Sequence, residues 1–317
     1  MAGSQAKVCA ADGDRRSYLR VGPTDLRTTS RALSALALIV ALAGTAAAED
    51  QPKPPAPSPA AAVSLEVSLT PDYTEGKYGT RHTTEILRVP LTVDWFVTDR
   101  LDFALTVPYL WEHGQSILAL LGGRVGRAPN RIGLPPRGRR RALFDRPQTQ
   151  DGLGDVLLDG TLVLLEEKSL FPEVATLGEV KFPTADSNKG LGTGEFDETV
   201  GIDLTKGLGE SWTAYVDVSY TFVGSPPGTR VDDFFGWSVG LGYAVTRALR
   251  FTSYVDGSTV TVRNPLVEHR IEKAPNDVRL RVEYTPTKLV QLRLEGLTGL
   301  SSGTPTFGVS AGVTLRF

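Results

Sequence analysis

The residues best suited to acid–base or metal chemistry are three histidines, His82, His113 and His269. Imidazole is a common zinc ligand, but zinc sites place their ligands at short, regular spacings that these histidines lack. His113 and Ser116 have the residue types of a base and its nucleophile, yet three residues along a strand point two side chains to opposite faces. No oriented third partner is evident in the sequence. The histidines therefore predict neither a metal site nor a hydrolase.

Two further motifs have the residue types of a ligand site without its spacing. Asp186-Ser-Asn-Lys-Gly190 alternates oxygen-bearing side chains as a calcium loop does, but it lacks the terminal carboxylate that completes such a loop. The Gly-Leu-Gly triplets lack the following helix that a dinucleotide fingerprint needs. Cys9 is the only cysteine, which excludes a disulfide framework and a cysteine-based zinc site. We therefore expect no metal, no cofactor and no enzymatic activity.

Charged residues at alternate positions indicate β-structure instead. The segments Val278-Arg-Leu-Arg-Val-Glu-Tyr284 and Val290-Gln-Leu-Arg-Leu-Glu295 alternate apolar with polar side chains. This period of two is typical of a strand with one apolar and one polar face. A charge that faces lipid at the middle of a bilayer costs about 2–4 kcal/mol, so we expect these charges to face the interior of a membrane barrel.

Segments with this alternation recur about twelve times, each with about 7 to 12 residues, close to the length that a tilted strand needs to cross a bilayer. They lie near Val63–Thr70, Ile86–Val97, Leu101–Trp111, Asp155–Leu165, Val174–Phe182, Thr199–Thr205, Trp212–Val223, Gly236–Val245, Leu249–Val260, Asp277–Tyr284, Val290–Thr298 and Thr306–Phe317.

The connections between these segments alternate in length. The short ones are Thr98–Arg100, Glu166–Pro172, Gly207–Ser211, Thr246–Ala248 and Thr285–Lys288. The longer ones include Pro71–Arg81, Glu112–Gly154, Asp186–Gly194, Gly224–Asp232 and Asn264–Asn276. A soluble sandwich has no reason to sort its loops by parity, whereas an outer-membrane barrel has short periplasmic turns and longer external loops. Aromatic residues collect near both ends of the segments, as interfacial girdles require.

The sequence therefore predicts an all-β fold: a closed antiparallel transmembrane β-barrel of about twelve strands over residues 63–317. Closure pairs the last strand with the first, so Phe317 does not lie at an open edge. A final alternating strand that ends in phenylalanine also resembles the signal that the outer-membrane barrel-assembly machinery recognises, and we expect Phe317 to serve as that assembly signal. The strand number is less certain, because Pro90, Pro108 and Pro183 each remove a ladder donor near a strand end.

If one face of each strand contacts lipid, the other face lines the lumen, and its charges are unevenly distributed. The first seven strands contribute Glu66, Asp94, Asp102, Asp155, Asp159, Glu179, Asp203 and Asp217, with Arg88 and Lys181; the last four contribute Arg250, Arg279, Arg281, Arg293 and Arg316, with Asp256, Glu283 and Glu295. Facing acidic and basic walls would create a transverse field that filters polar solutes. In a barrel of about twelve strands the walls are close, and the same charges could instead pair and fill the interior. The sequence leaves both interpretations open. It also leaves open whether Arg137-Gly-Arg-Arg-Arg141 folds inward as a constriction or lies outside, in solvent or near lipid headgroups.

The N-terminal residues have the pattern of an export signal. Arg27 and Arg31 precede the apolar run Ala35–Leu42, which is too short for a membrane helix, and Ala46-Ala-Ala48 offers a small-residue cleavage site. We therefore expect a signal peptide over residues 1–48, cleaved near Ala48, and a proline-rich periplasmic linker over residues 49–62. The leader is long for such a signal, so either translation starts later, near Val21, or the extra residues are a nonstandard leader.

Three short motifs resemble those of a known family. Gly152-Leu-Gly-Asp155, Lys181-Phe-Pro-Thr184 and Gly190-Leu-Gly-Thr-Gly194 are similar to motifs of the outer-membrane transporter family associated with the meta-pathway of phenol degradation. The likeness spans most of residues 63–317, with a departure at Ala185, where the family tends to have glycine. It implies a passive channel for small, often aromatic or hydrophobic compounds, and it implies no set of substrate residues. The glycines also have a structural explanation, since they permit bends and tight loop starts at strand ends.

We therefore expect a monomeric channel or transporter in the bacterial outer membrane, in contact with membrane lipid and with a small-molecule solute that the sequence does not identify. The formal net charge of −2 gives no polybasic bias toward nucleic acid. The alternative hypothesis is a structural or surface-interaction barrel whose lumen is filled by side chains. Its function would then lie in the outer loops, above all in Glu112–Gly154.

Overall fold

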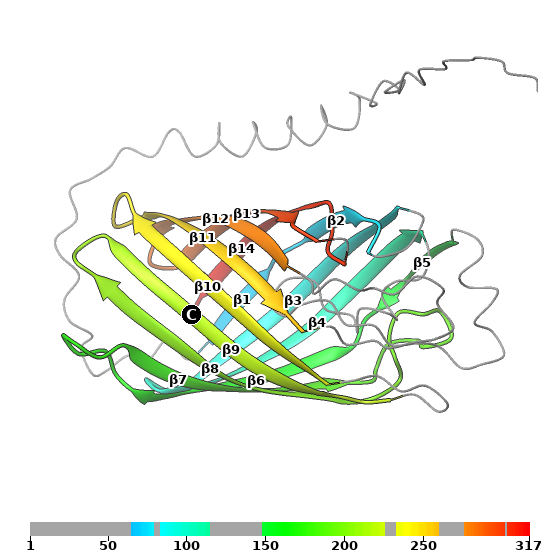
Figure 1. The fold of residues 1–317 in the computed structure, drawn as a ribbon, viewed down its shortest axis with the longest axis horizontal. Coiled ribbons are helices and arrows are strands. Elements are labelled where there is room, and N and C mark those ends of the chain that lie inside the picture. The colour runs from blue at the N-terminus through cyan, green and yellow to red at the C-terminus, as the bar shows by residue number, and fades with distance from the viewer. Residues whose placement is uncertain (1–64, 79–82, 115–147, 226–232, 260–275, 302) are drawn as a thin grey trace, which may run out of the picture. The chain divides into compact units, whose positions relative to one another are not determined.

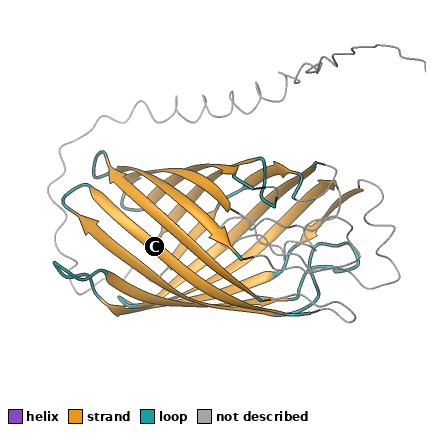
Figure 2. Ribbon diagram, in the orientation of Figure 1, coloured by secondary structure: helices purple, strands orange, loops and turns teal. Residues whose placement is uncertain are grey.

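The alternating segments form a barrel of antiparallel strands in the computed structural model (Figure 1). The structure describes residues 65–78, 83–114, 148–225, 233–259, 276–301 and 303–317. All of them belong to one unit, residues 55–317, and they consist of strands and loops (Figure 2). This described part of the chain contains no helix long and apolar enough to span a membrane.

Fourteen hydrogen-bonded segments make up the sheet. They are β1 (Leu65–Leu69), β2 (Asp72–Gly76), β3 (Thr84–Thr98), β4 (Leu101–Gly114), β5 (Gln148–Leu153), β6 (Val156–Leu165), β7 (Glu173–Phe182), β8 (Asp197–Leu208), β9 (Trp212–Val223), β10 (Phe234–Ala244), β11 (Leu249–Ser258), β12 (Asn276–Thr287), β13 (Val290–Gly299) and β14 (Phe307–Arg316).

Two of these segments, β1 and β2, are halves of one strand. Proline has no N–H to donate, so Pro71 interrupts the ladder between them. The register does not change across the interruption, because Leu69 pairs with Leu91 and Asp72 pairs with Arg88. The prediction of a loop from residue 71 onward is therefore wrong in its first part, since residues 72–76 continue the strand.

β5 and β6 are also halves of one strand, and a β-bulge joins them. Their partner β4 pairs Tyr109 with Leu153 and Thr106 with Leu157. Four steps along β5 and β6 thus oppose three steps along β4, which is the mark of one extra residue. Because two pairs of segments are halves of single strands, the fourteen segments make twelve strands, and the predicted strand number is confirmed.

The bulge reverses which residues face the barrel interior. At the bulge the Gly154 N–H donates to the Pro108 carbonyl at 2.8 Å. Odd-numbered residues face outward in β5, where Leu153 is 59% exposed. They face inward from Asp155, which is 3% exposed and directly precedes β6, onward through β6. The single extra residue therefore turns the Asp155 carboxylate toward the interior.

β14 closes the barrel by pairing with both β1 and β2. The pairing extends to the last residue, where the Phe317 N–H donates to the Leu65 carbonyl at 2.9 Å. The predicted closed antiparallel barrel, in which the final strand pairs with the first, is therefore confirmed.

The connections alternate in length as predicted. Short turns join β3 to β4, β6 to β7, β8 to β9, β10 to β11 and β12 to β13, and longer connections lie at the other end of the barrel. We call these the short-turn end and the long-loop end. The predicted loop Glu112–Gly154 is partly wrong, because it contains the end of β4 and all of β5. Near this end outward positions such as Glu75 and Asp151 are polar, so the strands continue beyond the alternation that marks them in the sequence.

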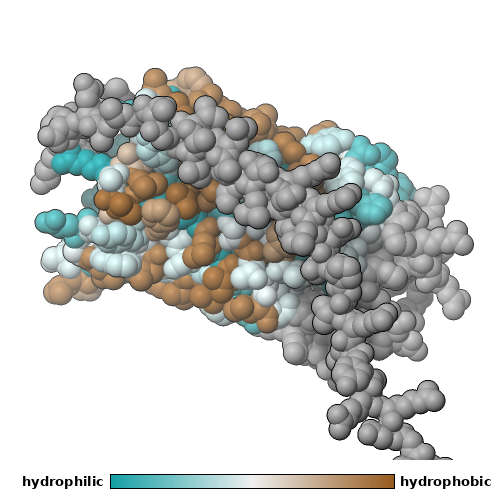
Figure 3. All heavy atoms as spheres, turned by 90° about the horizontal axis from the view of Figure 1, so that it is seen from above, coloured by the Kyte–Doolittle hydropathy of each residue, from teal (hydrophilic) through white to brown (hydrophobic). Residues whose placement is uncertain are grey.

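The outward face of the barrel is apolar (Figure 3). Its large exposed side chains include Leu69, Leu91, Leu105, Leu158, Val200, Ile202, Val239, Leu241, Val255, Leu280 and Val309. Exposed aromatic side chains lie near the strand ends, for example Trp95 at the short-turn end and Phe222 at the long-loop end, and the Trp212 and Tyr243 rings contact each other with centroids 4.7 Å apart. Such a surface suits hydrocarbon in the middle and headgroups at its edges.

Candidate functional site

Ten charged side chains on the inner face form a network of ion pairs, which we call the paired wall. Four pairs lie directly opposite each other on neighbouring strands: Arg88–Asp72 at 2.8 Å, Arg281–Glu295 at 2.7 Å, Arg293–Glu283 at 3.4 Å and Arg316–Glu66 at 2.8 Å. The two remaining members are Arg279 and Asp256, which are 2.5 Å apart, and Arg279 also lies 3.6 Å from Glu295. The predicted positive charges of the last strands are therefore largely neutralised by neighbouring carboxylates.

Tyr254 lies on the inner face beside the paired wall. The guanidinium carbons of Arg279 and Arg281 are 4.8 and 5.1 Å from its ring centroid, within cation–π distance. The ring packs over Gly240, directly opposite on β10, where an added Cβ would collide with it. The Tyr215 ring lies 5.9 Å away on the other side of Gly240. Glycine on β10 thus makes room for two aromatic rings on the inner face.

Four carboxylates form a contrasting region, which we call the acidic wall: Asp159, Glu179, Asp203 and Asp217. Asp159 lies directly opposite Glu179, and Asp203 lies directly opposite Asp217. Like charges in such positions destabilise a sheet. All four residues are partly exposed, as are the other predicted acidic residues Asp94 and Asp102. The acidic wall therefore places like charges at neighbouring positions of the inner face.

Near the long-loop end, Lys181 is held between two aspartates. Its ammonium nitrogen lies 3.1 Å from a carboxylate oxygen of Asp155 and 3.1 Å from one of Asp197. The three side chains are 0%, 1% and 2% exposed. Burial of charges away from water is costly unless they are paired and hydrogen-bonded, so this group, which we call the Lys181 triad, holds its geometry tightly.

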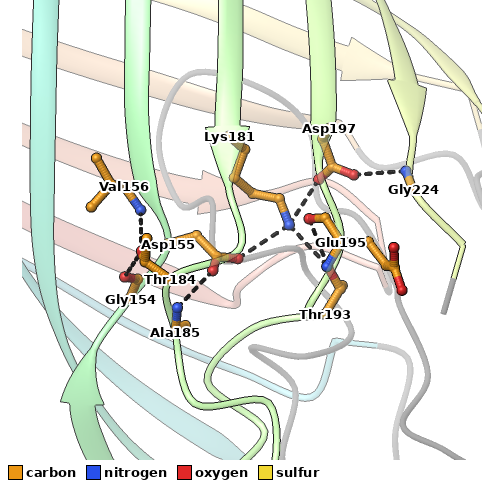
Figure 4. A network of polar contacts seen from close by, with 10 residues as sticks. All are labelled: Gly154, Asp155, Val156, Lys181, Thr184, Ala185, Thr193, Glu195, Asp197 and Gly224. Carbon is orange, nitrogen blue, oxygen red and sulfur yellow. Dashed lines mark hydrogen bonds and ion pairs between the residues drawn. The ribbon is translucent and has the colours of Figure 1, made fainter.

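Backbone and side-chain donors complete the triad (Figure 4). The Asp155 carboxylate accepts from the Ala185 N–H at 3.0 Å, and the Asp197 carboxylate accepts from the Gly224 N–H at 3.0 Å. Lys181 also donates to the Thr193 hydroxyl at 2.9 Å. The triad therefore joins β7 and β8, the residue at the start of β6, and the loops on either side of β8.

Thr184 supports the bulge that turns Asp155 inward. Its hydroxyl accepts from the Val156 N–H at 2.9 Å and donates to the Gly154 carbonyl at 3.1 Å (Figure 4). One side chain thus satisfies two backbone groups beside the extra residue of the bulge. This is a physical reason for the threonine that ends the Lys181-Phe-Pro-Thr184 motif.

The glycine-rich segment 190–194 packs against the triad. Gly190 and Gly194 have φ values of +78° and +77°, in the left-handed region that glycine adopts readily. An added Cβ on Gly192 would lie 2.8 Å from both the Asp155 carboxylate and the Ala185 side chain. The three motifs that suggested the family in the sequence therefore meet in one place, although their spacing along the chain gave no sign of this.

Two residues with clear roles were missed by the sequence analysis. Leu191 is 1% exposed, and its side chain leaves no room for a Cβ on Gly152, which faces inward from β5. Tyr78 is 2% exposed, has a φ of +48° that is uncommon outside glycine, and donates its hydroxyl to Thr74 at 2.7 Å. Burial raises the pKa of the Tyr78 hydroxyl. The only sequence signal was Leu191 itself, a lone apolar residue between two glycines.

The remaining predicted residues occupy separate places. Arg250 donates to the Tyr215 hydroxyl at 3.1 Å. His113 is on the outward face, where its Nδ1 lies 2.7 Å from the Thr149 hydroxyl. The carboxylate of Asp186 accepts from the Asn188 N–H at 2.9 Å, which forms a local turn. His82, Ser116, Arg137–Arg141, His269, the expected signal peptide and the expected linker lie outside the described residues. Within the described ranges, no group of three or more histidine, cysteine or acidic side chains could hold a metal ion.

Comparisons with known proteins agree with this architecture. The COG4313 outer membrane channel from Pseudomonas putida F1 superposes with a TM-score of 0.59 at 13% identity, covering 84% of this chain and 100% of that one. The NanC porin gives a TM-score of 0.50 at 10% identity, covering 79% and 100%. At these identities the likeness shows the fold, that of outer-membrane β-barrels. A search of curated protein sequences found no match.

A family model matches residues 71–317, which include every described strand after β1. The matched residues include the bulge at Gly154, the Lys181 triad and the glycine-rich segment. The chain belongs to the family described as "Putative MetA-pathway of phenol degradation".

Proposed function

We propose that this protein is a passive diffusion channel of the bacterial outer membrane. The observation that carries the proposal is a closed barrel whose outward face is apolar and whose inner face, toward the short-turn end, carries charged side chains that remain partly exposed. Charged side chains on the inner face of a membrane barrel cost little desolvation free energy where water reaches them. A water-filled lumen would supply that water.

The solutes that fit best are small polar aromatic compounds, of which phenols are the simplest. The family description points to phenol degradation, and the resemblance of the sequence motifs implies small aromatic compounds. The inner face would also favour solutes that carry hydroxyl or charged groups, because its acidic and paired walls are polar. Tyr215 and Tyr254 supply aromatic faces at the same level of the barrel.

A second candidate is a barrel with a filled lumen and functional outer loops. It is favoured by the burial of inner-facing residues toward the long-loop end, where Ile86, Leu110, Thr221 and Phe234 are each at most 1% exposed. A lumen packed with side chains at this level would block diffusion.

Planar-bilayer recording of the refolded mature barrel separates the two candidates. A channel gives stable conductance steps and admits phenol and phenolate into proteoliposomes, as measured by osmotic swelling. Silent bilayers, with a barrel that still shows heat-modifiable electrophoretic migration, would exclude the channel and support the filled barrel. The double variant Asp159→Asn with Glu179→Gln neutralises two carboxylates of the acidic wall. If this wall lines the conducting path, the reversal potential should show a selectivity shifted toward anions.

The same proposal includes the expected targeting and assembly. The export signal over residues 1–48 would be cleaved near Ala48, Phe317 would be read by the barrel-assembly machinery, and the barrel would act as a monomer. N-terminal sequencing of protein from isolated outer membranes tests the cleavage. Deletion of Phe317 tests the assembly signal, and a loss of outer-membrane yield without loss of refolding in detergent is the expected result.

A further inference from the structure

The loop between β7 and β8, residues 183–196, folds toward the barrel interior. Four of its residues, Ala185, Gly190, Leu191 and Gly192, are buried. Leu191 packs against Gly152, and Gly192 packs against Asp155. Gly152 and Asp155 lie on the two sides of the bulge, and both face the barrel interior. A connection that lay outside the barrel could not reach these positions.

The loop is attached to the wall by the Lys181 triad at two separate points. Near its beginning, the Ala185 N–H donates to Asp155 at 3.0 Å. Near its end, the Thr193 hydroxyl accepts from Lys181 at 2.9 Å. Figure 4 shows both attachments converging on the end of β7. Loss of the lysine would remove one attachment directly and leave two buried carboxylates without their shared cation, which weakens the other.

The other contacts of the loop with the wall are mostly polar: the Thr184 hydroxyl bonds to the backbone at the bulge, and the Lys189 ammonium donates to the Asp151 carbonyl at 3.2 Å. Its buried apolar side chains are Leu191 and the small Ala185, and the Phe196 ring contacts that of Phe182. The glycines beside Leu191 lower the cost of moving the backbone. Segments with few apolar contacts open locally at low free energy. The position of the loop therefore depends largely on charged and polar contacts, and the Lys181 triad supplies two of them.

We propose that loop 183–196 is the constriction of the channel and that the Lys181 triad is the latch that holds it there. The loop lies at the level where inner-facing residues are buried, whereas inner-facing residues nearer the short turns are partly exposed. The latch thereby determines the largest solute that passes. This inference rests on the proposed channel function and names the residues that set its size limit.

The test combines Lys181→Met with a thiol reporter at the buried loop position, Leu191→Cys. Cys9 is the only native cysteine and is replaced by serine in every variant. Release of the latch should make the reporter react roughly tenfold faster with a membrane-impermeant maleimide, because the fraction of open loop rises. Conductance should rise by roughly twofold, and larger polyethylene glycols should enter the pore.

The matched control is Lys206→Met. This lysine also lies on the β7–β8 hairpin, but at the short-turn end, where it pairs with Glu167 at 2.8 Å. It should leave the labelling rate, the conductance and the polymer cut-off unchanged. Thr193→Val is a second test that keeps the triad and its bond to Ala185 and removes only the bond from Lys181 to Thr193. It provides a folded variant if Lys181→Met does not assemble. It should accelerate labelling by a smaller factor.

The outcomes separate this inference from the proposed function. If the wild-type barrel conducts, and both Lys181→Met and Thr193→Val retain its labelling rate and polymer cut-off, the latch is refuted and the channel stands. If the wild-type barrel is silent, the channel is refuted, and the labelling rates still decide whether the triad holds the loop.

Discussion

The paired wall and the acidic wall are built on the same sheet geometry and treat charge in opposite ways. Side chains directly opposite each other on antiparallel strands have Cβ atoms about 4.5–5.5 Å apart, so each pair interacts strongly. In the paired wall these positions hold an arginine against a carboxylate, as in Arg281 and Glu295. In the acidic wall they hold two carboxylates, as in Asp203 and Asp217. Within these cross-strand pairs, the charges attract in one wall and repel in the other.

The difference indicates where function acts on the lumen. Proteins are expected to break local rules of stability at functional sites. The rule against like charges at directly opposite positions of a sheet is one such rule. The paired wall sets arginines against carboxylates, whereas the acidic wall sets carboxylates directly opposite each other. The Lys181 triad belongs to the same side of the barrel as the acidic wall and shows that carboxylates there are compensated where they are fully buried.

The largest expected effect is at the Lys181 triad. Lys181→Met leaves two buried carboxylates without their cation and should lower the free energy of unfolding by about 3–5 kcal/mol. Urea unfolding in lipid vesicles measures it. The triple variant with Asp155→Asn and Asp197→Asn should recover most of the loss, because no buried charge remains. An undiminished stability of the single variant would mean that the triad is not buried as described.

Breaking the paired wall should have the next largest effect. Arg281→Gln removes the nearer of the two arginine partners of Glu295, which is 13% exposed, and should destabilise the barrel by about 1–3 kcal/mol. The exchange of the two residues, Arg281→Glu with Glu295→Arg, keeps a pair of opposite charges and should restore part of the loss. The same unfolding assay compares the three variants, and equal stability for the single and double variants would contradict the paired wall.

The acidic wall should respond with the opposite sign. Asp203→Asn removes a like charge opposite Asp217 and should stabilise the barrel by about 0.2–1 kcal/mol at low salt. The matched change in the paired wall, Glu283→Gln, removes an attraction to Arg293 and should destabilise it. The comparison between the two walls fails if both substitutions change stability in the same direction.

The smallest effect is expected at the short-turn end. The hydrogen bond from Lys206 lowers the pKa of Glu167, and the Gly207 N–H adds to this. A depressed pKa in the folded state contributes stability that is present at neutral pH and lost as the pH falls through that pKa. The pair is solvent-exposed, so Lys206→Met should raise the pKa of Glu167 toward its ordinary value without a resolvable change in unfolding. Carboxyl NMR of the labelled barrel measures the shift, and a clear loss of stability would show that the turn matters more than its exposure suggests.

Much of the fold could be predicted because lipid makes side-chain alternation strict. Segments such as Val278–Tyr284 place every second side chain in hydrocarbon. This alternation determines which side chains face lipid and which face the interior, without reference to neighbouring strands. The prediction failed beyond the apolar layer, as at Asp72–Gly76 and Gln148–Leu153, where outward positions meet water and alternation no longer follows.

The candidate site was only partly predictable. The sequence identified Asp155 and Lys181 as inner-face residues and singled out three short motifs, two of them rich in glycine, but it treated them as separate features. It did not identify Asp197, Leu191 or Thr193 as parts of one site, because their roles depend on contacts between segments that are distant in the chain.

The amino-acid order alone determined the strand faces, the alternation of turns and loops and the kinds of charge inside the barrel, since each follows from the local environment of single residues. Only the tertiary structure decided which charges meet. Strand register sets Arg281 against Glu295 and Asp203 against Asp217, and one extra residue at Gly154 turns Asp155 toward Lys181. Pairing across strands depends on register and bulges, and a shift of one residue reverses the face of every side chain that follows.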